Sequence, residues 1–378
     1  MRRSNRKPAA AATLLALACL ASAATGCGPR KPPGHPVDPD KPIDRVLMEP
    51  IVIQAYEDDG VIKFKSYDAE SLFDAGLDFL DDDKPKTAIA CFEKILEEFP
   101  GTKFKSATIF NAAYSYEKLA LKKDKEKNLE KAVSYYDTLI TSMPDSPHVV
   151  DALFRKGYCL EELGKIDEAI ALYAKLADRT DLKSEDKIEI KTRIGMLLMD
   201  KKDFEEAEDA LRETIAFFQD VSEDERIENN FYAAEAQFQI AEIYRLKFEA
   251  VSFSKEENKI RKELEEKLGY MVEAKDAYVE TIKIGNYHWA TASGFRVGML
   301  LRTLSDQMKS APIPPKIGTE ELKEIYFEVL DEQTRPLLES ALGVWEKTLL
   351  MAERVGYSGE WVEKTGKAMD ETLAMMGE

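Results

Sequence analysis

Few residues in this 378-residue chain could bind a metal or attack a substrate, and their spacing suits neither chemistry. The three histidines, His35, His148 and His288, stand alone, whereas zinc ligands come in closely spaced sets. The acidic run Asp81-Asp82-Asp83 could attract Ca²⁺, but no ligand loop of the required pattern follows it, so we expect a solvated turn. The sequence therefore predicts no metal site.

Catalytic motifs are also missing from the sequence. It holds no phosphate-binding glycine loop, no nucleophile elbow and no histidine paired with an acid and a nucleophile. Cys91 and Cys159 are expected to be buried free thiols. The balance of 71 acidic against 53 basic residues disfavours nucleic acid as a partner, because phosphate binding needs clustered Lys and Arg. We predict a protein without enzymatic activity, cofactor or small-molecule substrate.

Residues 1–27 have the pattern of an export signal. Four basic residues precede an apolar run from Ala9 to Ala24, which is short for a membrane span. The run ends in Ala24-Thr25-Gly26-Cys27, which resembles the bacterial lipobox and implies lipidation of Cys27. An ordinary signal peptide with an incidental cysteine is the alternative. Gly28 follows in place of Asp, and by resemblance to enterobacterial sorting this implies an outer-membrane lipoprotein facing the periplasm.

Two short segments separate the signal from the rest of the chain. Residues 28–50 contain seven prolines, so we expect an extended tether. In residues 51–67, the apolar runs Ile51–Ile53 and Val61–Phe64 flank Glu57-Asp58-Asp59-Gly60, a pattern typical of a β-hairpin. Such a hairpin would either cap the helices that follow or pair with a partner strand.

The remainder of the chain carries a helical repeat. Measured from residue 69, marker residues fall at positions 4, 7, 8, 11, 20, 24, 27 and 32: Leu72, Ala75, Gly76, Phe79, Ala88, Phe92, Ile95 and Pro100. This spacing resembles the 34-residue tetratricopeptide repeat, with Leu in place of the first Trp. The resemblance implies an all-α fold, a right-handed α-solenoid of helix–turn–helix units.

Small residues recur at positions 8 and 20, where the two helices of a unit are expected to cross. The pairs are Gly76/Ala88, Ala113/Ala132, Gly157/Ala169, Gly195/Ala207, Ala241/Ala274 and Gly298/Ala341. Their spacing predicts four repeats over residues 68–220, then a degenerate helical region with insertions over 221–378. There, the charged stretch 255–267 predicts a solvated helix, and an amphipathic helix near 360–376 is expected to seal the end of the array.

The family resemblance implies that the first helix of each repeat lines a concave groove, with positions 5 and 9 facing a ligand. The partner-binding candidates at these positions are Phe73, Leu77, Phe110, Tyr114, Phe154, Tyr158 and Met196. Phe238 and Phe295 continue the same row. Aromatic side chains suit a groove for a peptide or amphipathic helix. The alternative is that these rings pack between neighbouring first helices.

Two further resemblances bear on function. The segment Phe92–Pro100 is similar to the repeat ends of the β-barrel assembly lipoprotein BamD and of Tol-associated periplasmic proteins. The segments Gly285–Gly298 and Ala311–Pro315 resemble tetratricopeptide proteins of the myxobacterial envelope, some of them in gliding motility. The resemblances imply a lipid-anchored scaffold that binds cell-envelope proteins. A carrier of unfolded exported clients, a holdase, is the alternative.

Overall fold

The computed structural model describes residues 50–58, 61–254, 256–314 and 316–377. Cys27, the predicted signal and nearly all of the predicted tether lie outside these residues. The described chain forms two compact units, residues up to Gly164 and residues from Lys165 onward.

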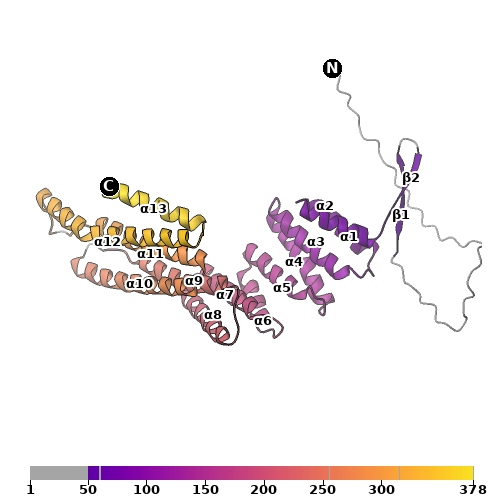
Figure 1. Cartoon of the computed structure of the whole chain (residues 1–378), viewed down its shortest axis with the longest axis horizontal. Coiled ribbons are helices and arrows are strands. Elements are labelled where there is room, and N and C mark those ends of the chain that lie inside the picture. The colour runs from indigo at the N-terminus through magenta and orange to yellow at the C-terminus, as the bar shows by residue number, and fades with distance from the viewer. Residues whose placement is uncertain (1–49, 59–60, 255, 315, 378) are drawn as a thin grey trace, which may run out of the picture. The chain divides into compact units, whose positions relative to one another are not determined.

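Within the described residues the fold is all-α apart from one hairpin, which confirms the predicted fold class (Figure 1). Thirteen helices follow the hairpin in this part of the chain: α1 Ala69–Asp81, α2 Pro85–Glu98, α3 Lys105–Ala120, α4 Lys125–Ser142, α5 Val149–Glu162, α6 Ile166–Ala177, α7 Ser184–Asp200, α8 Phe204–Asp224, α9 Phe231–Ala250, α10 Glu257–Ile284, α11 Tyr287–Lys309, α12 Glu320–Arg354 and α13 Glu360–Met376. Helices α1 to α12 correspond in order to the first and second helices of six repeats. The unit boundary falls between the two helices of repeat 3.

The hairpin is present as predicted. Strands β1 (Val52–Asp58) and β2 (Val61–Tyr67) pair antiparallel, with Val52 opposite Tyr67. These two residues pack on the apolar cluster of the first repeat, where the Tyr67 ring meets Phe99 edge-on at 6.3 Å. The Tyr67 hydroxyl also donates a hydrogen bond to Glu98, 2.7 Å away. The base of the hairpin therefore covers the first repeat, as the capping interpretation predicts.

Small residues allow the helices of a repeat to approach closely. A Cβ atom on Gly76 would lie 2.6 Å from the Phe92 ring, and one on Gly195 would lie 2.5 Å from Leu211. In both pairs the obstructing side chain stands at position 24, one helical turn beyond the small residue at position 20. The sequence predicted the close crossing, and the structure shows that the position-24 side chain fills it.

Repeats 5 and 6 differ from the earlier ones by longer helices. Ala241 and Ala274 stand 33 positions apart in sequence, yet both belong to one apolar cluster, because α9 continues to Ala250 and α10 extends over 28 residues. Lys267 departs from the solvated helix expected over 255–267. It is fully buried, and its ammonium donates hydrogen bonds to the carbonyls of Phe248 and Val251 at the end of α9.

Candidate partner-binding site

Three of the predicted groove residues are engaged in packing within the first unit. The Phe73 ring stacks on Phe104 with centroids 5.2 Å apart, and Leu77 packs against the same apolar cluster. The Phe110 ring stacks on His148 at 5.6 Å. All three are half-buried, so they set the fit of neighbouring helices, and a direct contact with a partner stays a prediction for them.

Tyr114 on α3 and Tyr158 on α5 line a surface hollow of about 300 Å³. Its other lining residues are Glu117, Lys118, Ala120, Leu121, Lys125, Leu129, Arg155 and Glu162. The Arg155 guanidinium lies 4.2 Å from the centroid of the Tyr114 ring, a cation–π contact. Leu121, just after α3, is 74% exposed and lies beside the rings. The site thus combines two aromatic rings, an exposed apolar side chain and fixed charge.

A buried carboxylate fixes the charge in this hollow. Glu117 accepts hydrogen bonds from the Tyr136 hydroxyl and from Arg155 Nη1, the latter at 3.0 Å. Burial raises the pKa of Glu117, although Tyr136 and Arg155 both favour the charged form. At the rim, Lys125 forms an exposed ion pair with Glu162 at 2.7 Å. Glu117 therefore orients Arg155 over Tyr114 and joins repeat 2 to the first helix of repeat 3.

The sequence analysis missed Glu117 and Arg155. Their positions in the repeat could have indicated them. Glu117 lies one helical turn after Tyr114, which is at position 9, and Arg155 directly follows Phe154, which is at position 5. Of the other candidates, Phe154 on α5 and Met196 on α7 are half-buried and belong to different compact units.

In the second unit, α13 covers the continuation of the aromatic row. Trp361 of α13 lies 6.3 Å from the Phe238 ring and 5.6 Å from the Phe295 ring. Phe238 is itself buried in the main cluster of this unit. These two phenylalanines therefore serve internal packing, and the expected sealing helix packs along α11 and α12 (Figure 1).

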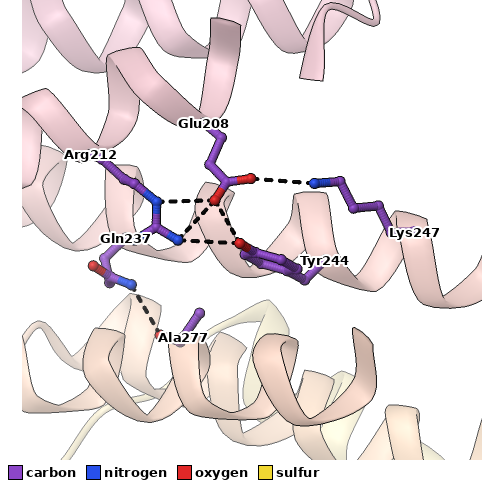
Figure 2. Close-up of polar contacts among 6 residues, drawn as sticks. All are labelled: Glu208, Arg212, Gln237, Tyr244, Lys247 and Ala277. Atoms are coloured by element: carbon purple, nitrogen blue, oxygen red, sulfur yellow. Dashed lines mark hydrogen bonds and ion pairs between the residues drawn. The ribbon is translucent and has the colours of Figure 1, made fainter. Parts of the chain in front are cut away.

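A half-buried carboxylate joins repeats 4 and 5 (Figure 2). Glu208 on α8 accepts hydrogen bonds from Arg212 on the same helix at 2.8 Å and from the Tyr244 hydroxyl on α9 at 2.6 Å. Lys247 lies 3.3 Å away. Burial would raise the pKa of Glu208, but the bonds from Tyr244 and Arg212 and the charge of Lys247 outweigh it and lower the pKa. These side chains form a polar clasp, a set of hydrogen bonds and an ion pair that links α8 of repeat 4 to α9 of repeat 5.

Within residues 50–58, 61–254, 256–314 and 316–377, no group of three or more His, Cys, Asp or Glu side chains could hold a metal ion. Cys91 and Cys159 are free thiols; Cys159 is buried as predicted, whereas Cys91 is half-buried. Among the helices of the described ranges, none has the length and apolar character needed to span a bilayer.

Sequence comparison identifies the repeats directly. Residues 118–182 and residues 188–216 each match a tetratricopeptide repeat family. These two segments of the chain are similar to tetratricopeptide repeats. They include α4 to α6 and parts of α7 and α8, and such repeats suggest a protein-interaction scaffold. No curated protein matches the sequence significantly.

Several solved structures are similar to this chain. A tetratricopeptide repeat protein from Cytophaga hutchinsonii is 13% identical, with a TM-score of 0.43 over 80% of this chain and 94% of its own. One from Parabacteroides merdae is 14% identical, with a TM-score of 0.38 over 81% of this chain and 98% of its own. The protein MamA is 14% identical, with a TM-score of 0.35 over 55% of this chain and 96% of its own.

Proposed function

We propose that this chain is a non-enzymatic, lipid-anchored scaffold that binds a partner protein on the first-helix face of repeats 2 and 3. The hollow between Tyr114 and Tyr158 is the observation that carries the proposal. Aromatic rings give large contact area at a low cost in side-chain entropy, so they are frequent anchors of protein interfaces.

The hollow suits an apolar side chain of a bound peptide. Tyr158 is half-buried and Leu121 is largely exposed, so both can lose solvent-accessible area when a partner binds. Arg155 is already held by Glu117 and Tyr114, so little side-chain entropy remains to be lost on binding. A partner would therefore meet a preformed surface.

The proposal places the protein in the bacterial envelope. Cys27, as the lipidated residue, would anchor the chain in the outer membrane with the repeats in the periplasm. The proline-rich tether of residues 28–50 would let them reach up to about 70 Å from the membrane. The resemblance to BamD, Tol-associated and myxobacterial proteins supports a role in a β-barrel assembly, division or motility complex.

The test is crosslinked affinity purification of the full chain from detergent-solubilised membranes. The variant is Leu121→Glu combined with Tyr158→Ala, and the matched control is Leu322→Glu, at an exposed leucine on α12. We avoid Phe110→Glu, because that ring packs on buried Tyr136 and its loss would disturb the fold.

We expect one dominant envelope partner with the wild-type chain and with the control, and its loss with the double variant. Recovery of the same partner from all three would show that the hollow is not the site. Recovery of many unrelated exported proteins would favour the holdase instead. Separately, Cys27→Ala should move the chain from the membrane to the soluble fraction, and an unchanged membrane fraction would contradict the lipid anchor.

A further inference from the structure

Helix α13 contacts its neighbours through two large side chains, Trp361 and Met369. Its buried residues are small: Thr365, Ala368 and Thr372. Both threonine hydroxyls donate hydrogen bonds to carbonyls of α13 itself, at 2.6 and 2.8 Å, and not to another helix. Trp361, at the first turn, is the larger of the two anchors, so much of the attachment depends on where this indole is seated.

The indole of Trp361 sits in a ready-made aromatic recess. Rings of Phe238 and Phe295 approach it from α9 and α11. Its Nε1–H donates a hydrogen bond to His288 Nε2, 3.2 Å away, and His288 Nδ1 lies 3.0 Å from the hydroxyl of Tyr357. The recess thus offers two apolar rings and one hydrogen-bond acceptor, which together match an indole.

The opposite end of α13 is held by charge. Arg302 of α11 bonds to the carboxylate of Glu371 at 3.1 Å and to the carbonyl of Ala368 at 3.5 Å. Phe295 and Met299 belong to the same apolar cluster as Ala368, and with Arg302 they fall at i, i+4 and i+7 on one face of α11. Helix α13 therefore lies on α11 as an amphipathic helix lies in a binding groove.

The turn before α13 separates it cleanly from α12. Helix α12 ends at Arg354 and α13 begins at Glu360. Between them Gly356 has a φ of +65°, a conformation that glycine adopts without strain, and Gly359 precedes the new helix. A change of backbone angles in this turn would release α13 without unfolding α12.

We propose that this face of α9, α11 and α12 is a second docking surface, separate from the hollow in the first unit, and that α13 is its occupant in cis. The partner that it fits is an amphipathic helix with an indole and, ten residues later, a carboxylate. This is the spacing of Trp361 and Glu371. Such a helix would bind in exchange for α13.

The probe for the test is a fluorescently labelled synthetic peptide of residues 355–377, which carries α13. Its binding is measured by anisotropy against three full-length chains: the wild type, Trp361→Ala, and the control Asp370→Ala at an exposed position of α13. The peptide can bind only to chains in which α13 has left the surface. Its apparent affinity is therefore the intrinsic affinity multiplied by the fraction of such open chains. We expect the Trp361→Ala chain to bind the peptide at least about tenfold more tightly than the wild type or the control. A peptide carrying Trp361→Ala should bind none of the chains.

Equal binding of the peptide by the wild-type and Trp361→Ala chains would overturn the proposal. A second measurement needs no variant. In hydrogen exchange of the wild-type chain, backbone amides of α13 should exchange faster than those around buried Trp345 in α12, because exchange would follow local release. Equal protection of the two helices would show that α13 is a permanent part of the unit and would overturn the proposal as well.

Discussion

The close crossing of α11 and α12 predicts that one added methyl group will destabilise the second unit. Gly298 is buried on α11, and a Cβ there would lie 2.1 Å from Nε1 of Trp345. The indole cannot move aside freely, because it is fully buried and donates a hydrogen bond of 3.0 Å to the carbonyl of Phe295. The variant Gly298→Ala must therefore displace the ring or separate the helices.

The expected loss follows from three terms. Overpacking a core costs about 1–3 kcal/mol. A buried donor that loses its partner costs about 1–3 kcal/mol more. Alanine in place of glycine favours a helix by about 1 kcal/mol. The net expectation for Gly298→Ala is a loss of about 1–5 kcal/mol in the free energy of unfolding.

Gly343→Ala on α12 is the matched control. A Cβ at this position meets nothing within 4 Å, so only the higher helix propensity of alanine acts. We expect the free energy of unfolding to rise by up to about 1 kcal/mol. Urea unfolding of each full-length chain, followed by circular dichroism, measures both variants. In a double-mutant cycle, Trp345→Leu should restore part of the loss in Gly298→Ala. The reasoning is refuted if Gly298→Ala is as stable as Gly343→Ala, or if the cycle shows no coupling.

Three other predictions concern partly buried polar groups. Burial raises the pKa of Glu235 to about 7, above its unfolded value, so the fold favours the neutral acid and loses stability as pH rises from about 4.5 through 7. Glu235→Gln should therefore stabilise the chain by up to about 3 kcal/mol at pH 8 and little at pH 4, and an equal effect at both pH values in thermal unfolding would contradict this. Burial lowers the pKa of His288 below the ordinary histidine value, so the imidazole is neutral at pH 7 and its contact with Trp361 should hold there and weaken only on acidification. Acidification should then change the tryptophan emission of the wild type but not of Trp361→Phe; the same change in both would exclude this contact as its source. Glu208→Ala should cost about 1–3 kcal/mol more than Glu206→Ala at a nearby exposed position, and equal unfolding midpoints would show that the clasp adds no stability.

The repeat architecture could be predicted because it depends on residue size at fixed spacing. A glycine such as Gly76, with Phe92 sixteen residues later, requires a close helix crossing wherever it occurs. The hairpin was predictable for a similar reason, since its turn and its alternating residues are local. In repeats 5 and 6 the same pairs were visible, but their wide spacing suggested insertions. In the structure, longer helices account for much of the wide spacing, because a helix can extend beyond the crossing without changing the crossing itself.

The site residues were less accessible to sequence reasoning, because their roles depend on distant partners. Position 5 of the repeat predicted Phe110 and Phe238 on the groove face. Whether such a ring faces solvent depends on side chains from elsewhere in the chain, such as His148 and Trp361. Lys267 shows the same limit. Its charged neighbours predict a solvated helix, whereas its own ammonium satisfies carbonyls at the end of α9.

Two carboxylates, buried Glu117 and half-buried Glu208, make the repeats non-interchangeable. At one junction Glu117 requires an arginine from the next first helix, and at another Glu208 requires a tyrosine and a lysine. A duplicated or transposed repeat would carry its carboxylate to a junction that lacks these donors, and a charge taken out of water without a partner is unfavourable. The array therefore cannot lengthen by simple gene duplication, as uniform repeat arrays can. Its order of repeats is fixed by chemistry, and an engineer who wishes to extend it would need to copy each junction together with both of its neighbours.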